Sequence, residues 1–132
     1  MIFLDSDVLI EILEKNSIKS DKIFETLEMY ANEEVVISEL VLEEVFFGIL
    51  KVTHNKQLLD QHPIFEIPVV EFNKQDALLA AEIGFEMEKL GKKKPRVDSL
   101  IASSVINQQG SLFTLNTRHY HDIKNLNLIP LQ

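Results

Sequence analysis

The sequence contains no cysteine, and its four glycines stand apart at positions 48, 84, 91 and 110. Without cysteine the chain cannot form disulfide bonds, zinc–thiolate sites or thiol nucleophiles. Isolated glycines exclude the glycine-rich fingerprints that bind nucleotide phosphates. No apolar run approaches the roughly 20 residues that cross a bilayer, and the N-terminus lacks the basic segment of a signal peptide. We therefore expect a cytoplasmic protein that does not enter a membrane.

The charge of the chain is negative and unevenly distributed. There are 13 basic and 21 acidic residues, which give a net charge of −8. Five of the basic residues lie in the segment 89–96, which contains no acid. The rest of the chain holds eight basic and 21 acidic residues, a balance of −13. The basic loop 89–96 is therefore either a solvated connector or a local attachment point for a polyanion on an acidic body.

Helical and strand patterns alternate along all 132 residues without a linker or a repeat. This length suits one domain, residues 1–132. Strands are expected at 2–4, 35–37, 65–67, 112–114 and 128–129, and helices at 7–15, 22–31, 38–50, 55–61, 74–90 and 98–110. Buried strands that alternate with helices predict a parallel sheet in a three-layer α/β fold.

Capping residues mark the ends of two of these helices. Ser20 and Asp21 offer an N-cap for the helix 22–31. Asn73 and Asp76 have the spacing of an N-cap residue and its N3 partner for the helix 74–90, and Gly91 suits the left-handed position after its end.

Asp5 carries the first functional signal. It follows the apolar run 2–4 and directly precedes a helical pattern. The carboxyl end of a buried strand, just before a helix, is where open α/β sheets place their ligands. The Ser6 side chain could form a hydrogen bond with the Asp5 carboxylate or with a backbone amide. A hard cation at such a strand end is one chemistry that this position favours.

Helical phase separates the three acids of the helix 38–50. Glu39 and Glu43 are four residues apart and are expected to face water. Glu44 has Leu40 and Val41 one turn before it, and Phe47 and Gly48 one turn after it. A carboxylate on this apolar face is costly unless it binds something positive. Glu44 is therefore either a half-exposed acid at the edge of the stripe or a metal-site residue, and we favour the second interpretation.

Asp98 and Asp7 both stand where an aspartate commonly caps a helix. Asp98 opens the helix that Gly110 ends, and the inward-facing Ile101 and Ala102 leave open that its carboxylate also faces a crevice. Asp7 is expected to cap the first helix and to support the site only indirectly.

These segments together resemble PIN-domain proteins, and among them the VapC-type toxin ribonucleases. Residues 2–10 resemble the family opening, an apolar strand followed by Asp-Ser/Thr-Asn-Val-Leu-Ile, with Asp7 in place of the usual Asn. Residues 37–49 are similar to the second motif, whose acid falls on Glu44, four residues before Gly48. Residues 98–104 resemble the third motif, whose first Asp is Asp98. The resemblance covers the full length of the chain.

The last motif departs from the family pattern. Residues 114–120 are similar to Thr-Arg-Asn-x-Arg-Asp-Phe, but His119 occupies the place of the fourth acid. Thr114 and Asn116 retain a hydroxyl and an amide, and Asp122 lies nearby but out of register.

The resemblance implies a PIN-like sheet of four or five parallel strands flanked by helices. It also implies a site in which Asp5 and Asp98 bind Mg²⁺ or Mn²⁺ and Glu44 holds a second metal or a water. Ser6, Thr114, Asn116 and His119 are candidates for the fourth position or for support of the ligands. The implied reaction is cleavage of RNA phosphodiester bonds. The basic loop would guide the RNA through Lys92, Lys93, Lys94 and Arg96, and Arg118 is a further candidate for RNA binding.

Two other functions stay open from the sequence. A catalytically weak PIN scaffold that binds RNA or protein is favoured by His119. A haloacid-dehalogenase-type phosphohydrolase is suggested by Asp5 and Asp7, which fit an Asp-x-Asp signature after a first strand. The resemblance further implies a small antitoxin partner that blocks the site, and a homodimer formed through apolar helix faces such as Phe46-Phe47.

Overall fold

The computed structural model describes residues 1–14, 17–57, 62–92 and 96–131. A parallel sheet of five strands forms its centre: β1 (Ile2–Leu4), β2 (Val35–Ser38), β3 (Val69–Val70), β4 (Ser111–Phe113) and β5 (Asn127–Ile129). The spatial order is β3-β2-β1-β4-β5, so β1 is the central strand. Its three residues are at most 2% exposed, because both neighbours and both faces are covered.

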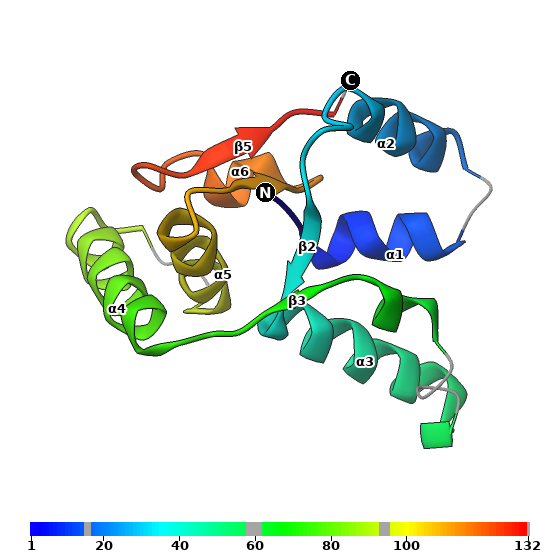
Figure 1. Cartoon of the computed structure of the whole chain (residues 1–132). Coiled ribbons are helices and arrows are strands. Elements are labelled where there is room, and N and C mark those ends of the chain that lie inside the picture. The colour runs from blue at the N-terminus through cyan, green and yellow to red at the C-terminus, as the bar shows by residue number, and fades with distance from the viewer. Residues whose placement is uncertain (15–16, 58–61, 93–95, 132) are drawn as a thin grey trace.

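Helices cover both faces of this sheet. Figure 1 shows α1 (Ser6–Glu14) and α2 (Ile18–Glu28) on one side, and α4 (Lys74–Lys89) and α5 (Arg96–Asn107) on the other. The helix α3 (Glu39–Thr53) follows β2, and the short α6 (Thr117–Tyr120) lies between β4 and β5. The prediction of a three-layer α/β fold with a parallel sheet of four or five strands is therefore confirmed. Among the described residues, no helix combines the length and the apolar character needed to cross a lipid bilayer.

The region before α4 differs from the expected strand at 65–67. Residues Pro63–Glu66 form a 3-10 helix, which begins with Pro63 and is capped by the imidazole of His62, whose Nδ1 accepts a hydrogen bond from Ile64 N at 3.2 Å. The strand β3 begins four residues later than the expected strand, after Pro68, whose carbonyl accepts a hydrogen bond from Ile37 N. Proline fixes φ near −65°, which suits the first turn of a helix. Of the helix expected at 55–61, residues 58–61 lie outside the described part of the chain.

Helix ends were predicted with mixed success. For α4 the capping box of Asn73 and Asp76 is confirmed, as is Gly91 with φ of 71°. The cap of α2 is Ser17 and not Ser20 or Asp21, so that helix begins earlier than predicted; Ser20 is the N3 partner of the capping box.

The helix α5 was predicted to run from Asp98 to Gly110 but spans Arg96–Asn107. Gln109 adopts the left-handed conformation after its end, with φ of 54°. Gly110 is required for a different reason. A Cβ atom there would lie 2.9 Å from Met1 O and 3.1 Å from the Phe3 ring, so only glycine allows the chain to pass this close to β1.

Candidate active site

The strand order places a crevice between β1 and β4. From β1 the chain proceeds outward to β2 and β3, and then returns to the other side of β1 as β4. The carboxyl ends of two strands that flank such a switch point form the usual ligand crevice of open α/β sheets. Leu4 pairs with Phe113 in the register of the two strands. The next residues, Asp5 and Thr114, therefore stand side by side at the mouth of the crevice.

Asp5 is held rigidly by its neighbours. Its backbone N donates to Phe113 O at 2.9 Å, and its carbonyl accepts the first hydrogen bond of α1 from Leu9 N. The carboxylate is 6% exposed. Its Oδ1 accepts from Ser6 N at 2.9 Å, and its Oδ2 accepts from the Thr114 hydroxyl at 2.8 Å. The bond from Ser6 therefore comes from its backbone amide, whereas the sequence suggested its side chain.

A cavity of about 150 Å³ opens beside Asp5 and collects most of the acids singled out from the sequence. Its lining consists of Asp5, Ser6, Asp7, Glu44, Asp98, Ile101, Asn116, His119 and Tyr120. Four carboxylates thus surround a space large enough for a cation and a few water molecules. This acidic cavity is the candidate active site.

Glu44 enters the acidic cavity from α3. Its side chain is half-buried while the adjacent Glu43 is exposed, in agreement with the helical phase read from the sequence. Among the described residues, Glu44 Oε1 is a buried oxygen that accepts no hydrogen bond. Burial raises the pKa of Glu44 to about 7, and the negative charges of Asp5 and Asp98 contribute further. Such a carboxyl group is suited to bind a cation or to accept a proton.

Asp98 enters from the first turn of α5 and is 7% exposed. Because α5 begins at Arg96, Asp98 is not the N-cap residue that its sequence position suggested. The Tyr120 hydroxyl lies 3.5 Å from its Oδ1, and His119 Nδ1 lies 3.7 Å from its Oδ2. Burial raises the pKa of Tyr120 far above its ordinary value, and the negative charges of Asp5 and Asp98 raise it further. The hydroxyl therefore stays protonated. Asp98 is thus flanked by a phenol and an imidazole.

Asp7 does not cap α1, contrary to the expectation, because the helix already begins at Ser6. Its Oδ1 accepts from Val8 N at 2.7 Å, and its Oδ2 accepts from Leu115 N at 3.1 Å. Burial and the charge of Asp5 raise the pKa of Asp7, although these hydrogen bonds oppose the rise. Asp7 therefore belongs to the acidic cavity, which the sequence interpretation underrated.

The donor set fits a hard divalent cation. Among the described residues, no three His, Asp or Glu side chains stand together as a ready-made metal cage. Mg²⁺ does not need one, since it usually keeps several waters and takes only one or two carboxylates from the protein. The buried, unpaired Glu44 Oε1 and the crowded carboxylates indicate that positive charge would stabilise this arrangement. The residues present therefore match the oxygen chemistry of Mg²⁺ or Mn²⁺.

The three basic candidates that the structure describes, Lys92, Arg96 and Arg118, do not line the acidic cavity. Lys92 Nζ forms an ion pair with Asp122 at 3.1 Å, so Asp122 supports the basic loop and is not a fourth acid of the cavity. Arg96 packs on α4, where a Cβ at Gly84 would lie 3.5 Å from its Nη1. Arg118 is exposed on α6. Lys93 and Lys94 lie outside the described residues.

Comparisons with known proteins give a consistent result. A family model described as PIN domain matches residues 2–125. Ribonuclease VapC2 of Rickettsia felis is 28% identical over 126 residues, which are 93% of this chain and 92% of that protein.

Solved structures extend this likeness to the whole fold. The crystal structure of VapBC2 from Rickettsia felis bound to a promoter DNA fragment matches with a TM-score of 0.82 and 27% identity, over 97% of both chains. DNA-bound VapBC from Salmonella typhimurium matches with a TM-score of 0.80 and 19% identity, over 96% of this chain and 95% of the other. FitAcB from Neisseria gonorrhoeae gives 0.80 and 19%, over 98% and 97%. The last two likenesses concern the fold alone.

Proposed function

Because the chain belongs to the PIN domain family, we propose that it is a metal-dependent ribonuclease, the toxin of a toxin–antitoxin pair. The observation that carries the proposal is the convergence of Asp5, Glu44 and Asp98 on one cavity at the switch point of the sheet. The similarity to Ribonuclease VapC2 and to the VapBC2 complex supports RNA as the substrate and an antitoxin as the partner. The expected location is the cytoplasm, because the proposed RNA substrate is found there.

The three acids divide into two proposed roles, cation binding and proton acceptance. Asp5 and Asp98 would hold the cation, since both are nearly buried and fixed by neighbouring groups. When bound, Mg²⁺ or Mn²⁺ would lower the pKa of a coordinated water and offset negative charge on the scissile phosphate. Glu44 would accept a proton from the attacking water at Oε1, because a pKa of about 7 suits a general base near neutral pH. Thr114 would keep the Asp5 carboxylate in a single orientation.

The test is cleavage of single-stranded RNA by the purified protein with Mg²⁺ or Mn²⁺, and its loss with a chelator. Asp5→Asn and Asp98→Asn should each remove most of the activity, by about 100-fold or more, because an amide oxygen cannot replace an anionic ligand. Glu43→Gln is the matched control, since Glu43 is exposed on the same helix as Glu44. Activity unchanged by both Asn variants would refute the assignment.

One observation favours a second function, that of an inactive scaffold that binds RNA. His119 stands beside Asp98 where the family motif has an acid, and a neutral imidazole adds no negative charge for a cation. In that case RNA would bind but would not be cut in the presence of either Mg²⁺ or Mn²⁺. The haloacid-dehalogenase alternative receives no such support, because both oxygens of Asp7 accept backbone hydrogen bonds and the family match is to the PIN domain.

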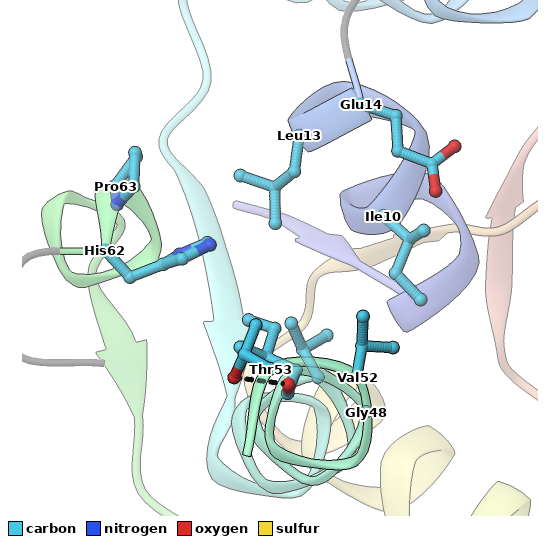
Figure 2. Close-up of a pocket in the computed structure, with 10 residues that line it drawn as sticks. Ile10, Leu13, Glu14, Gly48, Val52, Thr53, His62 and Pro63 are labelled. Carbon is cyan, nitrogen blue, oxygen red and sulfur yellow. Dashed lines mark hydrogen bonds between the residues drawn. The ribbon is translucent and has the colours of Figure 1, made fainter. Parts of the chain in front are cut away.

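The proposed antitoxin would dock in an apolar groove between α1 and α3. The groove has a volume of about 670 Å³ and is lined by Ile10, Leu13, Glu14, Val45, Gly48, Ile49, Val52, Thr53, His62 and Pro63. Figure 2 shows Ile10 and Leu13 of α1, Val52 of α3 and His62 before the 3-10 helix extending toward a shared space. Ile10 and Gly48 lie one helical turn beyond Asp7 and Glu44. A segment in the groove would therefore continue directly over the acidic cavity and block it.

Two exposed residues of similar character test this docking surface. Val52 in the groove is 82% exposed, and Ile18 on α2 is 79% exposed and is not part of it. Val52→Glu should weaken binding of the proposed antitoxin and restore toxicity in co-expression, whereas Ile18→Glu should do neither. Equal effects of the two substitutions would argue against the groove.

We further propose a homodimer, in which Phe47 and not Phe46 makes the main contact between the two copies. Phe46 packs against Phe65 within the chain, with ring centroids 5.1 Å apart, so it is only partly available to a second copy. Phe47 is 59% exposed and is the better candidate for a contact between copies. Phe47→Glu should shift the protein from dimer to monomer in light scattering.

A further inference from the structure

Asp7 makes a long-range connection across the acidic cavity. It stands in the first turn of α1, and its Oδ2 accepts a hydrogen bond at 3.1 Å from the backbone N of Leu115, 108 residues later in the chain. The second oxygen, Oδ1, is occupied by Val8 N at 2.7 Å. Both oxygens thus face donors of the protein, and the carboxylate ties the start of α1 to the segment that follows β4.

The residue before Leu115 has a more direct role. Thr114 Oγ1 lies 2.8 Å from Asp5 Oδ2 and 3.4 Å from Asp7 Oδ2. A hydroxyl group has one proton to donate, and the shorter distance assigns it to Asp5. The same oxygen accepts from Asn116 N at 3.1 Å. Asp7 therefore acts on this segment mainly through Leu115 N. Leu115 lies between Thr114, which orients Asp5, and Asn116, which lines the cavity.

We propose that Asp7 is a positioning residue that holds segment 114–116 against α1, so that Thr114 orients the Asp5 carboxylate and Asn116 lines the cavity. The inference rests on the proposed metal-dependent function. It differs from a role for Asp7 as an additional ligand, in which its negative charge would matter. An asparagine separates the two, because its single side-chain oxygen can still accept from Leu115 N without the charge, while its NH2 group gives up the bond from Val8 N at the start of the helix.

The experiment compares Asp7→Asn and Asp7→Ala in two measurements on the metal-free protein. The first is hydrogen exchange of the Leu115 amide by NMR, and the second is Mg²⁺ affinity by calorimetry. Alanine should speed the exchange and weaken Mg²⁺ binding by about tenfold each, the usual cost of losing a group that orients a metal ligand. Asparagine should keep both within about threefold of the wild type. Glu25→Ala, an exposed acid on α2, is the control.

Two outcomes would overturn the inference. A loss of Mg²⁺ affinity in the asparagine variant as large as in the alanine variant, with the Leu115 amide still protected, would assign Asp7 a role through its charge. Unchanged exchange in the alanine variant would show that the bond to Leu115 holds nothing in place. If alanine prevents folding, Asp7→Ser replaces it, because the shorter hydroxyl cannot reach Leu115 N. A wild type that neither binds Mg²⁺ nor cuts RNA would refute the proposed function, and the exchange data would still decide the role of Asp7.

Discussion

Replacing Glu44 by glutamine should make the metal-free protein more stable at alkaline pH. The pKa of Glu44 rises from its ordinary value of 4.5 to about 7 in the folded state, first through burial and then through Asp5 and Asp98. Between these two pH values the folded protein keeps a proton that the unfolded chain has released. The stability that the protonated Glu44 contributes is therefore fully present below pH 4.5 and is lost as the pH rises through about 7.

The size of the effect follows from the same shift. A fully charged Glu44 would destabilise the fold by at most about 3 kcal/mol. Its side chain is half-exposed, and screening by solvent reduces this to about 1–2 kcal/mol. At pH 8 Glu44→Gln should therefore raise the melting temperature by roughly 3–8 °C for a chain of this size. At pH 4 the variant and the wild type should melt together.

Thermal unfolding followed by circular dichroism, in a chelating buffer, measures this difference. Glu43→Gln serves as the control, because Glu43 is exposed and contributes only a minor part of the shift. Added Mg²⁺ should stabilise the wild type more than Glu44→Gln, since the cation compensates the charge that the variant lacks. A variant that is no more stable than the wild type at pH 8, or that is equally stabilised at both pH values, would contradict the electrostatic account.

Three further outcomes are expected. Replacing Lys92, Lys93 and Lys94 by serine should weaken RNA binding and reduce the slope of log affinity against log salt by about 0.7 for each lost phosphate contact; an unchanged slope would make the loop a solvated connector. His119→Asp should increase Mg²⁺ affinity severalfold in calorimetry and narrow any preference for Mn²⁺ over Mg²⁺ in the cleavage assay, because it adds a negative oxygen ligand beside Asp98. Asp76→Ala should lower the free energy of unfolding by about 2–3 kcal/mol in urea titrations, because this fully buried carboxylate accepts hydrogen bonds from α5 side chains that would lose their partner.

The sequence was a good guide wherever a local pattern carried the information. Asp5 could be placed because an apolar strand and a helix flank it directly. The exposure of Glu43 and the partial burial of Glu44 could be told apart because a helix turns by a fixed angle at each residue. Membership in the PIN domain family, read from four motifs in order, is confirmed by the family match over residues 2–125.

The errors arose where contacts distant in sequence decide the structure. An aspartate near a helix start is most often a cap, and no local signal reveals that Asp7 bonds to Leu115 instead. Tyr120 was read only as the final aromatic of a motif, yet its hydroxyl reaches Asp98. The strand expected at 65–67 failed because the apolar pattern outweighed Pro63, whose ring favours the first turn of a helix.

The pairing of β1 with β4 also has a consequence for the synthesis of the protein. Asp5 leaves the ribosome 109 residues before Thr114, the residue that orients it. At typical translation rates of about 5–20 residues per second, the chain spends roughly 5–20 seconds without the second half of its acidic cavity. During that time the backbone groups of β1 that pair with β4 have no partner strand. A nascent chain therefore cannot complete this acidic cavity until Thr114 and the residues after it have emerged.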